Sequence, residues 1–230
     1  MVFHGLIKST LLDYPGKLAC TLFTGGCNFR CPFCQNSALV LNPSSEPVID
    51  SIELDKFLKK RIRYLDGVCI TGGEPLLQKN VIDYIKYLKD LGYLVKLDTN
   101  GSFPDKLENL LSKDLVDYVA MDLKSSKEGY SKAVGIDNFD ITSIEQSVDL
   151  LQSSNIDHEF RTTLVKELHG EKEIEGIGLW LKKNQKLYLQ KFEDSGTNIQ
   201  QNLTGFNVNE MNSIKNILKS YINFVEVRGV

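Results

Sequence analysis

The chain has 230 residues, of which 42% are hydrophobic and 25% are charged, and its formal net charge is −3. This composition predicts a folded protein with a substantial core and excludes a disordered chain. With 27 basic and 30 acidic side chains, the chain offers no basic field for nucleic acid. No apolar run approaches the roughly 18 residues that span a membrane. The N-terminus lacks the pattern of a signal peptide, so we expect a cytoplasmic protein without a membrane partner.

Apolar segments of strand character alternate with segments of helical periodicity along the whole chain. The predicted strands, in chain order, are residues 18–23, 67–71, 94–98, 117–122, 158–165 and 186–192, with a short last strand at 223–227. Asp50 with Glu53, and Thr142 with Glu145, resemble capping boxes at helix starts. Repeated alternation of strand and helix predicts a parallel sheet with helices packed outside it.

The length limits how many strand–helix units the chain can hold. A complete eightfold barrel typically takes about 250 residues, and the pattern shows only six full units. We therefore predict an α/β fold that forms an incomplete, open (β/α)6 TIM-like barrel. No repeat or linker divides the sequence, so we expect a single domain over residues 1–230.

Three of the five cysteines are clustered, and the other two stand apart. Cys27, Cys31 and Cys34 lie in the segment 24–34, T-G-G-C-N-F-R-C-P-F-C, directly after the first predicted strand. Three thiolates on one short loop can converge on a single metal centre. Cys20 and Cys69 have no partner at ligand spacing and lie inside apolar strands, so we expect them to be small core residues.

Two kinds of metal site fit this loop. An iron–sulfur cubane usually takes four cysteine ligands, so three ligands would leave one iron open for a substrate, as a catalytic zinc keeps an open position. The alternative is a structural zinc site completed by a distant histidine, and the candidates are His4, His158 and His169. None of the three lies at the usual zinc-ligand spacing, which favours the cluster.

Two further strands end in glycine-containing turns. The second strand runs into T-G-G-E-P, residues 71–75, where Pro75 suits a first helical turn. Alone this is an ordinary turn, but two glycines also let a ligand approach the backbone carbonyls. The third strand ends in L-D-T-N-G, where a turn explains Asn100 and Gly101 but does not require Asp98.

The later strands carry polar residues toward their carboxyl ends. Asp122 and Lys124 lie two apart and so point to one side, either as an internal salt bridge or as functional groups. Arg161 needs an anion, which a carboxylate of the protein or of a ligand would supply. Gln190 lies near the end of the sixth strand. Barrels keep their active sites at this end of the strands.

In combination, these motifs resemble those of a known enzyme superfamily. The cysteine loop and G-G-E-P resemble the signature of the radical S-adenosylmethionine (SAM) superfamily. D-T-N-G with M-D-L-K resembles the activases of glycyl-radical enzymes, which include the pyruvate formate-lyase activating enzyme. Y-V-A-M-D-L-K with E-F-R-T-T resembles the branch that activates anaerobic ribonucleoside-triphosphate reductase.

The resemblance implies two cofactors, a [4Fe–4S] cluster and SAM, together with their binding residues. Cys27, Cys31 and Cys34 would ligate the cluster and serve catalysis through it. The implied SAM contacts are the backbone from Phe33 to Gln35 for the adenine, Gly72, Gly73 and Glu74 for the amino group, and Asp98, Asp122, Lys124 and Arg161 for the methionine and ribose. Gln190 departs from the pattern, since the pyruvate formate-lyase activases place a histidine near this strand. A ribose contact by Gln190 would therefore be weaker or differently arranged.

The resemblance also implies a reaction and its partners. Reduction of the cluster by flavodoxin or ferredoxin would cleave SAM, and a 5′-deoxyadenosyl radical would abstract hydrogen from a glycine of a partner glycyl-radical enzyme. Asp13, just before the first strand, is either a turn residue or a contact for the partner's loop. Two alternatives stay open: a radical SAM enzyme acting on a small molecule, such as 7-carboxy-7-deazaguanine synthase, and a metal-binding or electron-transfer protein without catalysis.

Overall fold

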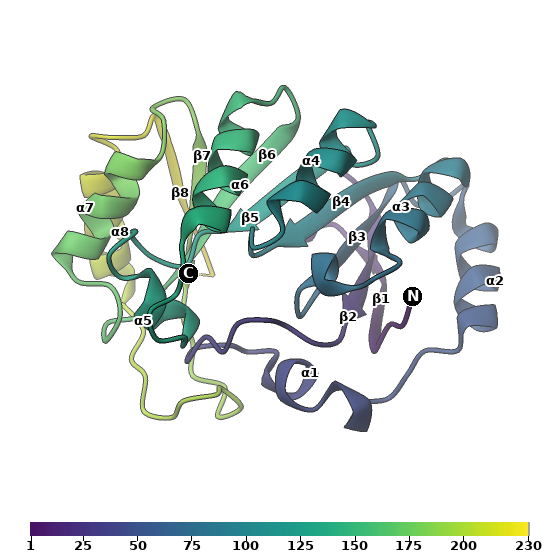
Figure 1. Cartoon of the computed structure of the whole chain (residues 1–230), viewed down its shortest axis with the longest axis horizontal. Helices are drawn as coiled ribbons and strands as arrows, with labels where there is room; N and C mark the ends of the chain where they lie inside the picture. The colour runs from purple at the N-terminus through teal and green to yellow at the C-terminus, as the bar shows by residue number, and fades with distance from the viewer. Residues whose placement is uncertain (230) are drawn as a thin grey trace. The chain divides into compact units, whose positions relative to one another are not determined.

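The computed structural model describes residues 1–229, and strands and helices alternate along the chain as predicted (Figure 1). The strands are β1 (Gly5–Thr10), β2 (Ala19–Thr24), β3 (Gly67–Gly72), β4 (Leu94–Thr99), β5 (Tyr118–Asp122), β6 (Asp157–Leu164), β7 (Lys186–Lys191) and β8 (Phe224–Arg228). The α-helices are α1 (Ser37–Leu41), α2 (Ser51–Arg61), α3 (Val81–Asp90), α4 (Pro104–Ser112), α5 (Tyr130–Val134), α6 (Thr142–Ser153), α7 (Glu171–Trp180) and α8 (Val208–Leu218). Two short 3₁₀ helices are η1 (Pro43–Ser45) and η2 (Pro75–Leu77).

The strands form one sheet in the order β1 to β8, so each strand neighbours the next along the chain. Strands β2, β3 and β4 are parallel, and so are β6, β7 and β8. This confirms the predicted α/β class and its repeated strand–helix units. Strand β1 was not predicted, and it pairs with β2 in the antiparallel direction. Its side chains are exposed or only half-buried, which explains why it lacks a clear apolar pattern.

The described chain divides into two compact units. Unit 1 comprises Met1–Asn28, Ala38–Thr99 and Phe103–Ala120, and unit 2 comprises Phe29–Ser37, Asn100–Ser102 and residues 121–229. The single domain over residues 1–230 stays a prediction.

Unit 1 has its core between the parallel strands and the helices beside them, α2, α3 and α4 (Figure 1). Helix α3 is amphipathic, and its residues Val81, Ile85 and Leu88 are fully buried. Burial of each such side chain contributes about 1.5–3 kcal/mol. Helix α2 begins where predicted, because the Asp50 carboxylate accepts hydrogen bonds from the backbone N–H groups of Ile52 (2.8 Å) and Glu53 (2.9 Å).

In unit 2, helices α7 and α8 lie side by side next to β7 and β8 (Figure 1). The capping box predicted for Thr142 and Glu145 is wrong. Asp140 caps this turn instead, since its Oδ1 accepts from the backbone N–H (3.0 Å) and the hydroxyl (2.6 Å) of Thr142. Glu145 forms a salt bridge with Lys127 at 2.6 Å. Asp140, two residues before Thr142, therefore has the capping role that the sequence pattern predicted for Thr142.

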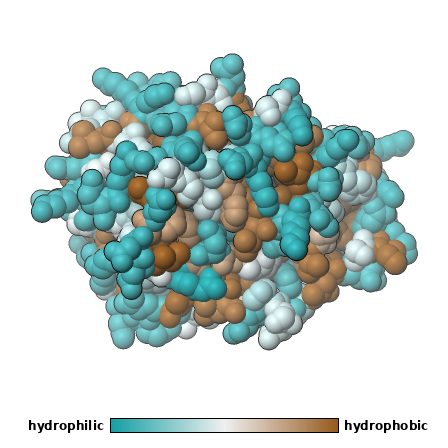
Figure 2. Space-filling model, in the orientation of Figure 1, coloured by the Kyte–Doolittle hydropathy of each residue, from teal (hydrophilic) through white to brown (hydrophobic). Residues whose placement is uncertain are grey.

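The surface agrees with the balanced composition. The face drawn in Figure 2 is mostly hydrophilic, with hydrophobic side chains between the charged ones. Within residues 1–229, no helix has both the length and the apolar character needed to cross a membrane.

Candidate functional site

The cysteine loop follows β2, and backbone contacts within unit 2 hold its second half. The N–H of Cys34 donates to the carbonyl of Cys31 at 3.0 Å, which closes a tight turn between these two cysteines. The N–H of Arg30 donates to the carbonyl of Val134, the last residue of α5, at 2.9 Å. Gly135 caps the C-terminus of α5 with a φ of 67°, and a Cβ there would lie 2.3 Å from the Arg30 carbonyl oxygen. Glycine at this position is therefore needed for the loop to approach the helix end.

The thiols of this loop differ in exposure and in charge environment. Cys31 is buried, whereas Cys34 is half-buried. Burial raises the pKa of the Cys34 thiol, while the N–H of Asn36 and the charges of Lys124 and Arg30 lower it in part. Since metal ligation needs the thiolate form, these cations favour the ligating state.

The donor set fits the predicted cluster. All five cysteines are thiols rather than disulfides, and the clustered three are soft ligands of the kind that iron–sulfur centres take. Cys27 belongs to unit 1, whereas Cys31 and Cys34 belong to unit 2. Across residues 1–229, no three Cys, His, Asp or Glu side chains are already gathered as a metal-binding group.

The G-G-E-P turn packs tightly against the start of the cysteine loop within unit 1. The N–H of Gly73 donates to Thr24 O (2.9 Å), and the N–H of Glu74 donates to Gly26 O (2.8 Å). A Cβ on Gly73 would lie 2.0 Å from the Gly26 carbonyl oxygen, and Gly72 has a φ of 114°. Both glycines are thus required by backbone geometry, beside any role toward a ligand.

Glu74 is fully buried, and its side chain bonds to its own unit. Its Oε1 accepts from the N–H of Leu76 at 2.9 Å, which caps η2, and from the hydroxyl of Thr99 at 2.8 Å. The carboxylate therefore holds η2 to the end of β4. The contact of Glu74 with the SAM amino group stays a prediction.

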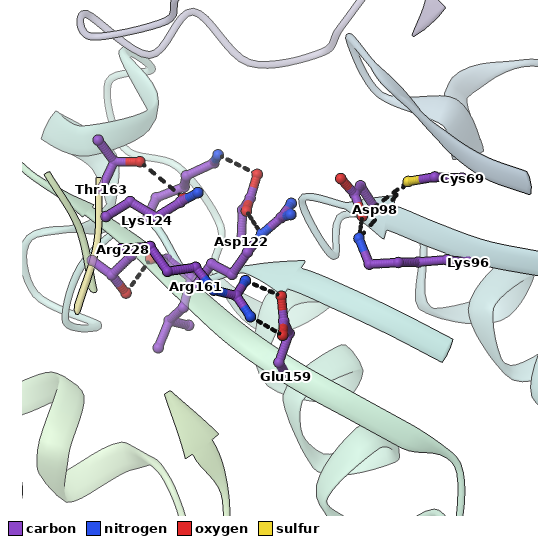
Figure 3. A network of polar contacts seen from close by, with 12 residues as sticks. Cys69, Lys96, Asp98, Asp122, Lys124, Glu159, Arg161, Thr163 and Arg228 are labelled. Atoms are coloured by element: carbon purple, nitrogen blue, oxygen red, sulfur yellow. Dashed lines mark hydrogen bonds and ion pairs between the residues drawn. The ribbon is translucent and has the colours of Figure 1, made fainter. Parts of the chain in front are cut away.

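Asp98 lies near the end of β4 beside a lysine that the sequence analysis did not single out. Lys96 forms an ion pair with Asp98, and the two side chains share one face of the strand. The thiol of Cys69 lies 3.8 Å from both Asp98 Oδ1 and Lys96 Nζ (Figure 3). The signal in the sequence was a lysine between the apolar residues Val95 and Leu97, two positions before Asp98.

Asp122, Lys124 and Arg161 come together in unit 2, as Figure 3 shows. Arg161 Nε lies 2.8 Å from Asp122 Oδ1, and Lys124 Nζ lies 3.1 Å from Asp122 Oδ2. Burial opposes ionisation of Asp122, but Arg161 and Lys124 outweigh it and lower the pKa to about 2. Burial likewise opposes the charge of Lys124, but Asp122 outweighs it and raises that pKa. The internal salt bridge considered for Asp122 and Lys124 is therefore present, and the anion that Arg161 requires is a protein carboxylate.

The residues predicted to contact the adenine, and Gln190, lie in unit 2. Phe33 is buried and packs against the ring of His169, with centroids 6.4 Å apart. The side-chain amide of Gln35 donates to the carbonyl of Glu193 at 3.3 Å. Gln190 accepts from the hydroxyl of Thr163 at 3.3 Å, so its side chain is held by the neighbouring strand.

His169 was considered from the sequence only as a candidate zinc ligand, and the structure gives it a different role. Its Nδ1 accepts from the N–H of Val165 at 3.0 Å, and its Nε2 lies 2.9 Å from the Lys124 carbonyl oxygen. Burial lowers the pKa of His169, so the imidazole is neutral at pH 7 and Nε2–H donates to Lys124. His169 thus fixes the backbone at Lys124. The sequence did not predict this role, because His169 lies in a loop, where no periodic pattern indicates which way a side chain points.

A second ion pair of unit 2 was also missed. Arg228 binds the buried carboxylate of Glu159 through both terminal nitrogens, at 2.7 and 2.9 Å (Figure 3). Its guanidinium also stacks on Tyr188, with 3.4 Å from Cζ to the ring centroid. Strand order is needed to place Arg228 near Glu159, because 69 residues separate them.

The remaining singled-out residues lie in unit 1. The predicted burial of Cys20 and Cys69 is confirmed, and burial raises the pKa of Cys20 to about 12. Asp13 accepts a hydrogen bond of 2.6 Å from the hydroxyl of Thr21 on β2.

Comparison with known proteins gives a family for the chain. The model of the Radical SAM superfamily matches residues 21–175. A relative from Methanocaldococcus jannaschii, named provisionally as a glycyl-radical enzyme activating enzyme, is 34% identical over 98% of this chain and 95% of its own length. The 7-carboxy-7-deazaguanine synthase of Thermoplasma acidophilum is 25% identical over 74% of this chain and 76% of its own length.

Solved structures share the fold at low sequence identity. Streptococcus suis SuiB bound to S-adenosylmethionine superposes with a TM-score of 0.68 at 12% identity, and the match covers 91% of this chain and 52% of SuiB. This likeness and the family match confirm the predicted fold class, the (β/α)6 barrel of the radical SAM type. The chain therefore belongs to the Radical SAM superfamily, whose cofactors are a [4Fe–4S] cluster and S-adenosylmethionine.

Proposed function

We propose that this chain activates a glycyl-radical enzyme, and that its partner is an anaerobic ribonucleoside-triphosphate reductase. The observation that carries the proposal is the similarity to the M. jannaschii relative, which extends over nearly the whole of both chains. The order of the motifs D-T-N-G, M-D-L-K and E-F-R-T-T supports the branch of activases that act on anaerobic ribonucleoside-triphosphate reductase. We further propose a cytoplasmic location and flavodoxin or ferredoxin as the reductant.

The proposed site follows the residues in chain order. Cys27, Cys31 and Cys34 would hold the cluster, and the backbone at Phe33 and Gln35 would lie along the adenine. When bound, the cluster and SAM supply an electron and a radical that abstracts hydrogen. The other proposed SAM contacts are Gly72, Gly73, Glu74, Asp98, Asp122, Lys124, Arg161 and Gln190.

The contribution of the protein is to present fixed charges to the ligand. Asp122 is kept ionised by Arg161 and Lys124, so its carboxylate would accept hydrogen bonds from ribose hydroxyls. Lys124 keeps a positive charge that favours the thiolate of Cys34, and it would also pair with the SAM carboxylate. Because these groups are already held in ion pairs, little side-chain ordering is needed when SAM binds.

A glycyl radical on the partner is the direct test. The anaerobically reconstituted, reduced chain is incubated with SAM and candidate partners, and electron paramagnetic resonance follows the radical. We expect a glycyl radical signal on the reductase and formation of 5′-deoxyadenosine. Cys31→Ala should abolish both. Cys20→Ala is the matched control, because Cys20 is a buried thiol outside the loop, and it should retain the iron and the activity. Absence of a radical on every partner, with cluster and SAM binding intact, would refute the proposal.

A second candidate is a radical SAM enzyme that acts on a small molecule. The similarity to the T. acidophilum 7-carboxy-7-deazaguanine synthase, which covers about three quarters of each chain, favours it. Under this candidate, the same incubation would leave the partner proteins without a radical while a small metabolite is consumed in a SAM-dependent reaction. Mass spectrometry of the metabolites before and after incubation distinguishes the two.

A further inference from the structure

A lysine is buried in the middle of strand β4. Only 2% of the Lys96 side chain is exposed, although lysines are almost never fully buried without a partner. Its ammonium forms an ion pair with Asp98, lies 3.8 Å from the sulfur of Cys69, and lies 6.0 Å from the ring centroid of Tyr118. Within residues 1–229, Asp98 is the carboxylate paired with Lys96.

Strand register places Lys96 in a polar row that crosses three neighbouring strands. Thr21 of β2 pairs in register with Cys69 of β3, and Cys69 pairs with Lys96 of β4. Asp98 lies two residues further along β4 and so on the same face. Asp13 extends the row, since it accepts the 2.6 Å hydrogen bond from Thr21. The interior row of unit 1 is therefore Asp13, Thr21, Cys69, Lys96 and Asp98.

The ion pair fixes one oxygen of Asp98. Oδ1 interacts with both Lys96 and Cys69, which restricts rotation of the carboxylate (Figure 3). A buried ammonium is costly unless a counter-charge lies beside it, and Asp98 supplies that counter-charge to Lys96. The Asp98 side chain is 13% exposed, whereas that of Lys96 is almost fully enclosed. Asp98 is thus the member of the pair that can meet a ligand.

We propose that Lys96 is a positioning residue, which orients the Asp98 carboxylate for its contact with SAM. The inference rests on the proposed SAM contact of Asp98 but not on the identity of the partner enzyme. A residue that acts only through another loses its effect once the other is neutralised. A lysine that merely stabilises the fold would instead influence SAM binding independently of Asp98.

A double-mutant cycle on the reconstituted full-length chain tests this difference. The four proteins are wild type, Lys96→Met, Asp98→Asn and the double variant, and the measured quantity is the Kd of SAM from its effect on the cluster's electron paramagnetic resonance signal. We expect Lys96→Met to weaken SAM binding about tenfold. In the Asp98→Asn background, Lys96→Met should change the Kd by less than about twofold.

Lys89→Met is the matched control, because Lys89 forms a Lys–Asp ion pair of 2.6 Å with Asp117 in the same unit. It should leave the Kd of SAM unchanged. Iron content and far-UV circular dichroism establish folding, and Lys96→Gln replaces Lys96→Met in the cycle if the latter does not fold. Additive effects of Lys96 and Asp98, or an unchanged Kd in the Lys96 variant, would overturn the inference. If Asp98→Asn alone leaves the Kd unchanged, the SAM contact of Asp98 fails and the inference fails with it. If the double-mutant cycle gives the expected Kd values but no glycyl radical forms, only the proposed partner is refuted.

Discussion

The substitution Asp122→Asn tests whether the carboxylate between Arg161 and Lys124 stabilises the protein through its charge. Asparagine keeps the shape of the side chain but removes the charge that both cations face. The two cations lower the pKa of Asp122 from 3.8 to about 2, against the opposing effect of burial. A shift of about two pK units corresponds to about 2–3 kcal/mol. We therefore expect Asp122→Asn to lower the free energy of unfolding by at least about 2 kcal/mol at pH 7.

The pH dependence gives the sign of this effect. Since the pKa of Asp122 is lower in the folded state than in the unfolded state, its stabilising contribution is fully present above about pH 5. It is lost as the pH falls from about 4 toward 2, where wild type also carries a neutral group at this position. The difference in unfolding free energy between wild type and Asp122→Asn should therefore shrink over that interval.

Urea unfolding followed by far-UV circular dichroism measures both quantities on the reduced, cluster-free chain from pH 7 to pH 3. Asp157→Asn is the matched control in the same unit, because Asp157 is 78% exposed and lies 3.8 Å from Lys186. An exposed pair of this kind contributes at most about 1 kcal/mol, so the control should unfold close to wild type. Equal stability of Asp122→Asn and wild type at pH 7, or a difference that does not change with pH, would refute the reasoning.

Two further predictions concern the glycine turn and the buried histidine. Gly73→Ala should abolish measurable SAM binding and lower the melting temperature, because the alanine Cβ would lie 2.0 Å from the Gly26 carbonyl oxygen. SAM binding and a melting temperature equal to those of wild type would contradict the tight packing of this turn. Because burial lowers the pKa of His169, the unfolded chain binds its proton more readily, so stability is greatest above about pH 6.5 and falls as the pH drops below it. The difference in melting temperature between pH 7.5 and 5.5 should be smaller in His169→Gln, and an equal difference in both proteins would exclude this contribution.

The strands were predictable from sequence where apolar residues make up most of a short segment. The segments 67–71 and 94–98 correspond to β3 (Gly67–Gly72) and β4 (Leu94–Thr99) within one residue. Strand β1 was not predictable in this way. Its residues Lys8 and Ser9 are exposed, and its pairing with β2 depends on an antiparallel register that no local pattern specifies.

In the candidate site, only contacts between residues close together in the sequence were predictable. The period of two predicted that Asp122, the last residue of β5, and Lys124 point to one side, and they do form an ion pair. Their contact with Arg161 depends on β6 lying next to β5, which the sequence alone does not establish. Lys96 was overlooked because a lysine in a strand is usually exposed, and the register with Cys69 is needed to place it inside.

Asp98 and Asp122, which lie at or near the ends of their strands, each form an ion pair with a nearby lysine, but the two lysines differ in exposure. Each has a lysine two residues away in the sequence, Lys96 before Asp98 and Lys124 after Asp122. A lysine placed before the aspartate lies deeper in the strand, and Lys96 is accordingly 2% exposed. A lysine placed after it lies beyond the end of β5, and Lys124 keeps 17% exposure. Lys124 therefore keeps enough exposure for the proposed ligand contact and lowers the pKa of the Cys34 thiol through its charge, whereas the proposed effect of Lys96 on a ligand passes through Asp98.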